Sequence, residues 1–344
     1  MEVTVTDAHT RKAFDIINIY KNKGYKVSPV SSKSFLHRAF LSLVYLSAVK
    51  KEPDAKSCVL PTEDQTILHM FDKNCFCKIP PKESFKTAID KKSFSKFCEK
   101  EGFLTPKTFT LKELLEKDEL PTALIVKPKS GSGALGIKFI DDIKELKSLD
   151  INEEEYIIQE RLKETKKVEG AFFLFDNAKP VSFYSHKRLK TYPSRGGVSI
   201  YSVSTNNQEL KKIGEKLLSK LNWNGFAMIE FIKDENGYKI IELNPRVWGS
   251  IMLSEFCGSN MLENYVLLCY ERDLKEASVK TGKKIRWLIP WDIKYLLKNF
   301  YRLDTKDTCY INFSYAGIYR GGLFLLYQVL NPLIIKKLFK KIFV

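Results

Sequence analysis

The chain has 344 residues, more than one ordinary hydrophobic core accommodates, so we expect two or three domains. Hydrophobic residues make up 44% and charged residues 28%, which indicates a globular chain and excludes a disordered one. The 57 Lys and Arg residues outnumber the 41 Asp and Glu residues by 16. This excess favours nucleotides, nucleic acid or anionic membranes as partners, although lysines on solvated surfaces explain it equally well.

The seven cysteines are scattered along the chain. They form neither a CxxC pair nor a zinc-binding pattern, so we expect reduced thiols. The first residues, "MEVTVTDAHT", are charged and lack the apolar run of a signal peptide. We therefore expect a cytoplasmic protein.

The first 82 residues alternate between short apolar strands and amphipathic helices. Strands are predicted at 2–7, 25–31 and 57–61, and helices at 10–24, 34–49 and 64–74. Strands separated by helices of this length indicate a small parallel α/β domain. Its first turn, "TDAHTRKA", contains no glycine, so we do not expect a dinucleotide to bind there. The proline-containing stretch "KIPPKES" marks the boundary to the next domain.

A glycine-rich stretch follows a predicted helix at 88–102 and a predicted strand at 122–128. In "VKPKSGSGALGIKFI", Gly131, Gly133 and Gly136 have the GxGxxG spacing of a dinucleotide-binding loop. A Rossmann loop must open a helix, whereas the following "IKFID" alternates as a strand. We therefore predict a strand, a loop and a strand, which form either a phosphate-binding hairpin or a plain one.

The segment "GFAMIEFIKDENGYKIIELNPRVWGS" predicts a β-hairpin that carries acidic side chains. Glu242 and Asn244 are two residues apart, so they project from one face of their strand. A three-residue loop at 235–237 would place Glu230 opposite Glu242, on that same face. Two carboxylates and an amide oxygen would then converge, and such hard ligands suit Mg²⁺. The alternative is a surface hairpin with charged outer positions.

The last part of the chain, 276–344, is predicted to be mostly helical. Within it, "GGLFLLYQVLNPLII" is fifteen residues without charge, followed by the basic "KKLFKKIFV". A membrane-spanning helix needs about 20 apolar residues, and Pro332 interrupts this run. The basic amphipathic end either lies on an anionic membrane surface or packs on the protein with its lysines in solvent.

Four stretches, taken in order, resemble the ATP-grasp superfamily, and within it the carbamoyl-phosphate-synthase-like proteins. They are "VKPKSGSGALGI", "IIQERL", "SHKRLKTYPSRGGVSIYS" and the hairpin segment. The likeness covers roughly residues 1–275. It implies a pre-ATP-grasp α/β domain at 1–82, an ATP-grasp domain at 83–275 with nucleotide between two subdomains, and a C-terminal segment at 276–344.

The resemblance also implies three groups of site residues. An ATP-binding group would contact the phosphates and the adenine: Lys91, Lys127, Ser130, Gly131, Ser132, Glu160 and Leu162. A metal-binding group would hold Mg²⁺, for which Mn²⁺ could substitute: Glu230, Glu242 and Asn244. A catalytic group would stabilise the charge of the reacting phosphates: Arg246, Lys187 and Arg188. For Lys187 and Arg188 a solvated surface position is an equal alternative.

Two further assignments stay open. The carboxylate that binds the ribose is either Glu164 or Glu169, because "KETKKVEG" departs from the spacing usual in the family. His186 either contacts a ligand or has a structural role.

The implied activity is ATP- and Mg²⁺-dependent ligation with release of ADP. Phosphoryl transfer to a small-molecule carboxylate would give an acyl phosphate, which an amine or a thiol would attack while the glycine-rich loop excludes water. The alternative is a catalytically silent ATP-binding regulator or scaffold. Nucleic acid is not expected as a partner, because no stripe interleaves basic and aromatic residues. The sequence leaves a homodimer open and contains no decisive pattern for the carboxylate or the nucleophile.

Overall fold

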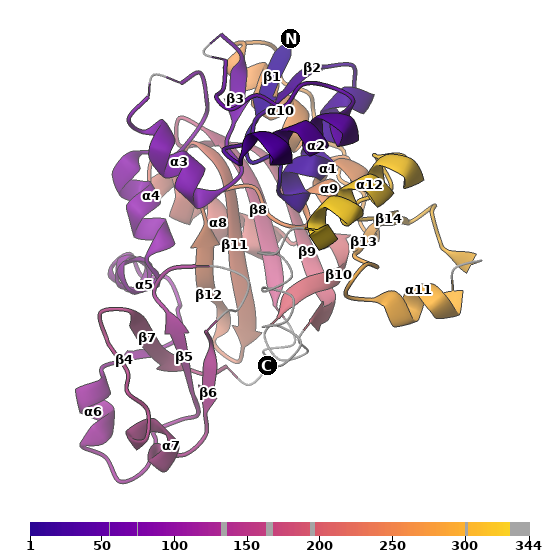
Figure 1. Cartoon of the computed structure of the whole chain (residues 1–344). Helices are drawn as coiled ribbons and strands as arrows, with labels where there is room; N and C mark the ends of the chain where they lie inside the picture. Colours follow the sequence, from indigo (N-terminus) through magenta and orange to yellow (C-terminus); the bar gives the residue numbers. More distant parts are fainter. Residues whose placement is uncertain are drawn as a thin grey trace.

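The computed structural model describes residues 1–54, 56–73, 75–131, 136–162, 168–192, 197–299 and 302–330. The strands of this part of the chain form three sheets of three, seven and four strands. Figure 1 shows the three-stranded sheet at one end, the seven-stranded sheet in the middle and the four-stranded sheet at the opposite end. The predicted combination of a small parallel domain with a larger mixed α/β fold is confirmed.

The N-terminal domain is built on a parallel sheet in which β1 lies between β2 and β3. Its elements are β1 (Glu2–Val5), α1 (Arg11–Asn22), β2 (Lys26–Pro29), α2 (Phe35–Tyr45), β3 (Cys58–Leu60) and α3 (Asp64–Met70). α1 begins after Thr10, whose side chain accepts a hydrogen bond from the Ala13 N–H. Residues 12–20 of α1 are all buried, so this helix is the centre of the domain's packing.

The predicted helix at 88–102 corresponds to α5 (Lys91–Lys100), and a separate helix, α4 (Lys82–Ile89), precedes it. Asp90 lies between them in extended conformation, and its carboxylate accepts a hydrogen bond from the Ser93 N–H at 2.6 Å. An aspartate at this position satisfies a free N–H of the first helical turn, so it begins a new helix. The break places Lys91 beside the glycine-rich stretch, where its N–H donates to the Lys129 carbonyl at 2.9 Å.

The four-stranded sheet has the order β4-β7-β5-β6, and its neighbouring strands are antiparallel. Its elements are β4 (Thr108–Phe109), α6 (Leu111–Leu115), β5 (Leu124–Pro128), β6 (Lys138–Ile140), α7 (Ile143–Lys147) and β7 (Tyr156–Glu160). The glycine-rich stretch connects β5 to β6, which confirms the predicted order of strand, loop and strand. Gly131 has φ +108° and Gly136 has φ +75°, values that favour glycine over other residues.

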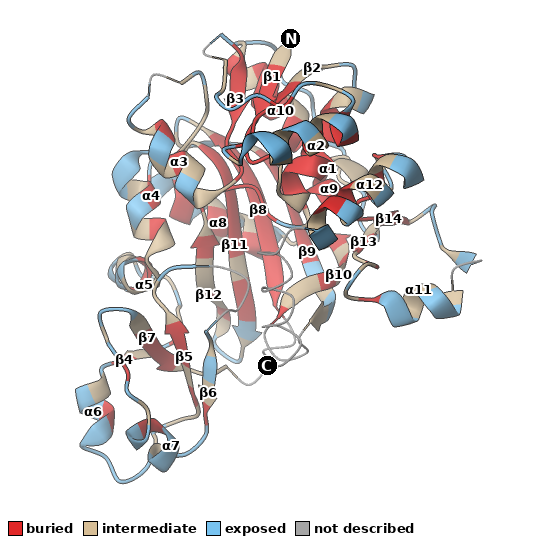
Figure 2. Cartoon of the chain, viewed as in Figure 1, coloured by how far each residue is buried: buried red, intermediate tan, exposed pale blue. Residues whose placement is uncertain are grey.

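The seven-stranded sheet has the order β12-β11-β8-β9-β10-β13-β14. Its strands are β8 (Glu169–Asp176), β9 (Lys179–Tyr192), β10 (Val198–Thr205), β11 (Gly225–Asp234), β12 (Gly237–Asn244), β13 (Lys284–Arg286) and β14 (Thr308–Tyr310). One face packs against α8 (Gln208–Lys220). The other face packs against α9 (Ile251–Phe256), α10 (Met261–Cys269) and the N-terminal domain. Both faces are therefore buried through the middle of the sheet, as Figure 2 shows.

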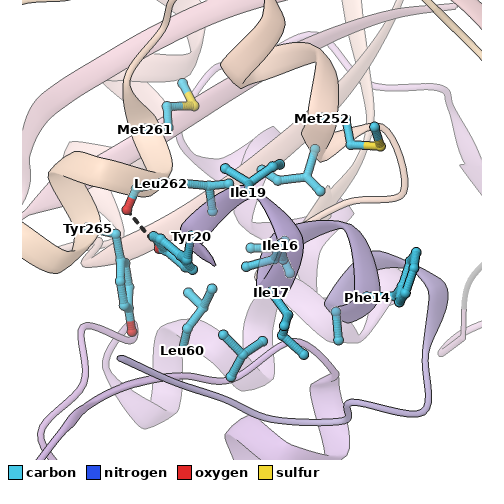
Figure 3. Close-up of a cluster of buried hydrophobic side chains, with 14 of the residues drawn as sticks. Phe14, Ile16, Ile17, Ile19, Tyr20, Leu60, Met252, Met261, Leu262 and Tyr265 are labelled. Carbon is cyan, nitrogen blue, oxygen red and sulfur yellow. Dashed lines mark hydrogen bonds between the residues drawn. The ribbon is translucent and has the colours of Figure 1, made fainter. Parts of the chain in front are cut away.

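The core between the large sheet and the N-terminal domain joins residues that are distant in sequence. In Figure 3, Tyr20 of α1 lies near Leu262 and Tyr265 of α10. The Tyr20 hydroxyl donates a hydrogen bond to the Leu262 carbonyl at 2.7 Å, so this buried polar group has a partner. The N-terminal domain is thus fixed to one face of the large sheet.

The described part of the C-terminal segment contains two short strands in addition to its two helices. β13 pairs antiparallel with β10, and β14 pairs parallel with β13, so both extend the large sheet. The helices are α11 (Ile293–Asn299) and α12 (Gly317–Leu330), and α12 packs on α2. No helix among the described residues is long and apolar enough to cross a membrane. Pro332 and the basic end lie outside the described residues.

Candidate functional site

The hairpin of β11 and β12 carries the predicted metal-binding group. Glu230 pairs directly with Glu242, as predicted. The predicted three-residue loop is wrong, because Asp234 pairs with Gly237 and leaves a two-residue turn at 235–236. After such a turn the numbers of two paired residues add up to an odd total, as for Asp234 and Gly237. If this register continued along the hairpin, Glu230 and Glu242 would point to opposite faces.

A β-bulge restores the shared face. Phe231 pairs with Ile240, but the next pair is Glu230 with Glu242, so Ile241 is the extra residue on β12. An extra residue on one strand reverses the alternation of side chains beyond it. The bulge, and not the turn, therefore brings the two carboxylates to the same face of the hairpin.

The metal-binding group is half-buried and linked by hydrogen bonds. Asn244 Nδ2 donates to Glu242 Oε1 at 2.9 Å, and the Arg188 guanidinium is ion-paired with Glu230. Burial raises the pKa of Glu230, although the nearby Arg188 opposes the effect. Burial acts in the same direction on Glu242, but the positive charges of Lys91 and Lys127 outweigh it and lower the pKa of Glu242. The carboxylate of Glu242 is therefore held in its ionised form.

Lys127 of β5 approaches the carboxylates from the four-stranded sheet. It is 5% exposed, and burial lowers its pKa to about 8, with Lys91 acting in the same direction and with Glu242 and Glu230 opposing. Lys91 Nζ donates to the Gly131 carbonyl at 3.0 Å, so a second ammonium group lies at the edge of the glycine-rich loop. Two lysines thus lie between the loop and the two carboxylates.

Arg246 follows β12 and is 9% exposed. Its guanidinium is ion-paired with Asp64 at the start of α3, at 3.1 Å, and it donates to the Val247 carbonyl. Burial alone would lower the pKa of Arg246, but Asp64 and Glu63 raise it. Arg246 is therefore held as a cation between the hairpin and the N-terminal domain.

The structure separates Lys187 from Arg188. Adjacent residues of a strand point to opposite faces. Arg188 contacts Glu230, whereas Lys187 lies 3.5 Å from Glu169. Glu169 also accepts a hydrogen bond from the Tyr238 hydroxyl at 3.1 Å, on the face of the sheet covered by α8. The structure thus brings Arg188 to the carboxylates, and it brings neither Lys187 nor Glu169 to them.

The rest of the predicted ATP-binding group lies in the four-stranded sheet and its loop. Glu160, at the end of β7, accepts a hydrogen bond from the Lys107 N–H at 3.0 Å and is ion-paired with Lys239 of β12. Leu162 is half-buried just beyond it, and Ser130 and Gly131 are exposed at the start of the loop. Ser132 and Glu164 lie outside the described residues.

His186 lies on the same face of β9 as Arg188. It is buried against Phe172, with ring centroids 4.6 Å apart, and neither ring nitrogen has a hydrogen-bond partner among the described residues. Burial, together with the charge of Arg188, lowers the pKa of His186 to about 3. The imidazole of His186 is therefore neutral, and it lies on the face of β9 that carries Arg188.

Several residues of the site could not be assigned from the sequence. Lys12 pairs with Glu63 at 3.1 Å and donates to the Val247 carbonyl at 3.2 Å. Arg11 donates to the Gly249 carbonyl at 2.6 Å. These contacts, like the one between Asp64 and Arg246, fix the loop after β12 to the N-terminal domain. The only sequence signal was the position of these residues at helix starts, at the carboxyl edge of a parallel sheet.

The donor set fits a hard divalent cation. Two facing carboxylates and a neighbouring amide are oxygen donors, which Mg²⁺ prefers, and Mg²⁺ usually takes only one or two carboxylates along with phosphate oxygens. The described part of the chain contains no group of three or more His, Cys, Asp or Glu side chains that could hold a metal ion. A cation at this site would therefore depend on a ligand's oxygen atoms as well as on the protein's.

Comparison with known proteins agrees with this arrangement. Residues 88–250 match the model of the ATP-grasp domain family. No curated protein matches the sequence. Among solved structures, the biotin carboxylase of Campylobacter jejuni, in complex with an ATP analogue, is 13% identical over 82% of this chain and 74% of that one, with a TM-score of 0.63.

Two further structures share the fold. The phosphoribosylamine–glycine ligase of Thermotoga maritima is 16% identical over 81% of this chain and 78% of that one, with a TM-score of 0.62. The N5-carboxyaminoimidazole synthetase of Staphylococcus aureus is 14% identical over 87% of this chain and 85% of that one, also with a TM-score of 0.62. The family match and the shared fold support the resemblance seen in the sequence: residues 88–250 match the ATP-grasp domain family, and the chain shares its fold with these enzymes.

Proposed function

We propose that the chain is an ATP- and Mg²⁺-dependent ligase that activates a small-molecule carboxylate as an acyl phosphate and joins it to an amine or a similar nucleophile. The observation that carries the proposal is the convergence of Glu230 and Glu242 with Lys127, which comes from the four-stranded sheet. Carboxylates alone would repel a triphosphate. Carboxylates that hold Mg²⁺ beside a buried lysine would bind it.

The bound cation would supply Lewis-acid stabilisation of the phosphate oxygens. The cation would be held by Glu230, Glu242 and Asn244. The Glu230 carboxylate would then either bind the cation and Arg188 together or exchange Arg188 for the cation. Lys127 and Lys91 would neutralise the phosphates from the side of the glycine-rich loop. Binding of a polyanion would also favour the protonated form of Lys127, whose pKa is otherwise lowered.

The acceptor would be activated between the hairpin and the N-terminal domain. Arg188 and Arg246 present two guanidinium groups on this side, and planar guanidinium groups suit carboxylate and phosphate oxygens. Fixed positive charge aimed at a phosphoryl group in transfer stabilises its transition state. In this assignment Arg246 steadies the acyl phosphate and Arg188 supports the acceptor side, while Lys187 takes no part.

The structural neighbours support this reaction class without defining the substrates. They include the biotin carboxylase domain of a 2-oxoglutarate carboxylase in complex with MgADP and bicarbonate, and a phosphoribosylamine–glycine ligase. In this chain the carboxylate, the nucleophile, a homodimer and the cytoplasmic location stay predictions.

A screen tests the proposal. The protein is incubated with ATP, Mg²⁺ and pairs of carboxylates and amines, and release of ADP is measured. ADP release that requires a carboxylate and is lost in Glu242→Gln supports the proposal. ADP release that is independent of any carboxylate, or retained in Glu242→Gln, contradicts it.

One observation favours the second candidate, a silent ATP-binding regulator. Glu230 already has a partner in Arg188, which competes with a cation for the carboxylate. The silent protein would bind ATP equally well with and without Mg²⁺ and would release no ADP with any acceptor. Calorimetric titration of ATP in the presence of Mg²⁺ and of a chelator separates the two candidates.

A further inference from the structure

Two adjacent helices outside the candidate site present a largely apolar surface to solvent. We call it the α2–α12 surface, and it consists of Phe35, Leu36, Leu43, Leu46, Ile318, Tyr319, Leu326, Val329 and Leu330. Each of these residues is between 47% and 85% exposed. Single exposed apolar residues are ordinary, but a contiguous group on two neighbouring helices is typical of a binding surface.

The exposed residues are not the unfilled edge of the protein's own core. α12 packs on α2 through Phe40 and Tyr327, whose ring centroids lie 5.7 Å apart. On the inner side, the Phe324 ring stacks on Phe14 of α1 at 4.2 Å. Both helices thus already bury one apolar face, and the α2–α12 surface is their second.

The two sequence segments that contain these helices carry basic residues and no acidic ones. Residues 16–51, which include α2, contain seven Lys and Arg residues and no Asp or Glu. Residues 308–344, which include α12, contain five Lys and Arg residues and no Asp or Glu. Together they carry 7 + 5 = 12 of the chain's net charge of +16, although they make up only about a fifth of its length.

Some of this charge is neutralised by other segments, and some is not. Lys23 is ion-paired with Glu255 and Glu263, and Lys26 with Glu2. In α2, the Arg38 side chain donates to the Lys33 carbonyl, and in α12 the Arg320 side chain donates to the Ala316 carbonyl. The acceptors of these bonds are backbone groups, so the bonds do not neutralise the two positive charges. Of the five basic residues at 308–344, four are lysines beyond Leu330, outside the described residues.

We propose that the α2–α12 surface docks the protein onto an anionic lipid surface. Apolar side chains would enter the boundary between headgroups and acyl chains, while the basic residues beside them contact lipid phosphates. Tyr319 is 72% exposed, and tyrosine favours this boundary because one end of its ring is apolar and the other is polar. The contact is peripheral, since no described helix is long and apolar enough to cross a membrane.

Charge complementarity selects lipid over a second copy of the chain. A dimer formed through this surface would bring two sets of basic residues together without an acidic residue on either helix to offset them. Juxtaposed like charges oppose association. An anionic bilayer instead complements both the apolar side chains and the positive charge of the surface. Apolar insertion and electrostatic attraction together give stable membrane binding, whereas either one alone gives weak binding.

Vesicle co-sedimentation of the full-length chain tests the proposal. Two preparations are compared: phosphatidylcholine alone, and phosphatidylcholine mixed with phosphatidylglycerol. One variant combines Leu36→Gln with Leu43→Gln, and a second combines Ile318→Gln with Leu326→Gln. The control combines Leu115→Gln with Leu274→Gln, two exposed leucines that lie outside the α2–α12 surface. Melting temperatures verify that all variants fold.

We expect binding to the anionic vesicles, weaker binding at high salt, and little binding to phosphatidylcholine alone. Each surface variant should lower the partition coefficient by about tenfold, because two aliphatic side chains no longer leave water. The control should bind as the wild type does. Failure to bind anionic vesicles overturns the proposal, and so does undiminished binding by both surface variants, which would place the lipid contact elsewhere. A dimer that the surface variants dissociate, without any lipid binding, would overturn it in favour of a second copy.

Discussion

Asp64 of α3 is ion-paired with Arg246, although 182 residues separate them in the chain. The pair links the start of an N-terminal helix to the loop that follows the hairpin of the candidate site. Because Arg246 is 9% exposed, few other carboxylates can take the place of Asp64. The position of the guanidinium therefore depends on a residue outside the matched ATP-grasp domain.

Replacement of Asp64 by Asn should misplace Arg246 without unfolding the protein. The amide keeps the shape of the side chain but loses the charge that holds the guanidinium. We expect ADP release to fall by about tenfold, equivalent to about 1.4 kcal/mol of transition-state stabilisation, with ATP affinity nearly unchanged. Asp72→Asn, at an exposed aspartate of the same domain, is the control. A parallel loss of ATP affinity would show that Asp64 acts on nucleotide binding instead.

Glu242→Gln should abolish the dependence of ATP binding on Mg²⁺ and should stop turnover. Glu242 is the carboxylate whose pKa is lowered, so it stays ionised, and glutamine cannot supply its charge. We expect a loss of at least about a hundredfold in ADP release, because a metal ligand and its charge are removed together. Glu235→Gln changes the same residue type at the exposed turn of the same hairpin and should have no effect. Calorimetry with and without Mg²⁺ provides the measurement, and retained metal dependence in Glu242→Gln would exclude this residue as a ligand.

ATP affinity should decrease as the pH rises through about 8. The pKa of Lys127 in the free protein is lowered to about 8 by burial, so the lysine is charged below this pH and neutral above it. Only the charged form attracts phosphates. Lys127→Arg should keep its affinity over the same range, because arginine remains protonated. The Kd from titrations at several pH values tests this, and an equal decrease in wild type and Lys127→Arg would assign the titration to another group.

The same shift predicts an effect on the stability of the ligand-free protein. The pKa of Lys127 is about 8 in the folded state and 10.5 in its unperturbed state. Between these values the unfolded chain binds more protons, so the free energy of unfolding should rise with pH. Lys127→Met should lack this contribution. Denaturant unfolding at pH values across the window measures the difference, and an identical pH dependence in both proteins would contradict the buried position of Lys127.

Arg188 and Lys187 should differ in their effects even though they are neighbours. Arg188→Gln removes the cation beside Glu230, so turnover should fall by about tenfold or more. Lys187→Gln changes only the opposite face, next to Glu169, and should leave turnover and ATP affinity unchanged. A steady-state assay of the two variants gives the comparison. Equal losses would mean that the strand does not separate the two side chains as described.

The sequence predicted those parts of the site that depend on local pattern. Alternation in "IKFID" correctly excluded a Rossmann helix after the glycine-rich stretch. The pairing of Glu230 with Glu242 was predicted too, but for the wrong reason, because a bulge at Ile241 leaves no mark in the alternation of residue types. The division between α4 and α5 had a visible signal in Asp90, a residue type that favours helix starts.

Other parts depend on contacts that no local pattern contains. The sequence could not tell which of Lys187 and Arg188 faces the carboxylates, because a shift of one residue in register exchanges them. The ion pair of Lys239 with Glu160 joins two sheets, and the pair of Asp64 with Arg246 joins two domains. These ion pairs depend on how elements distant in the sequence pack together, so the sequence alone could not predict them.

The shared core has a practical consequence for anyone who wishes to divide this protein. Val3 from the first strand, Trp248 from the loop after the hairpin, and Phe324 from the last described helix belong to one cluster of buried side chains. A recombinant fragment limited to residues 83–275 would leave an apolar face of the large sheet in water and would be prone to aggregate. Trimmed expression clones and split-reporter fusions should therefore keep the polypeptide whole from Met1 to Leu330.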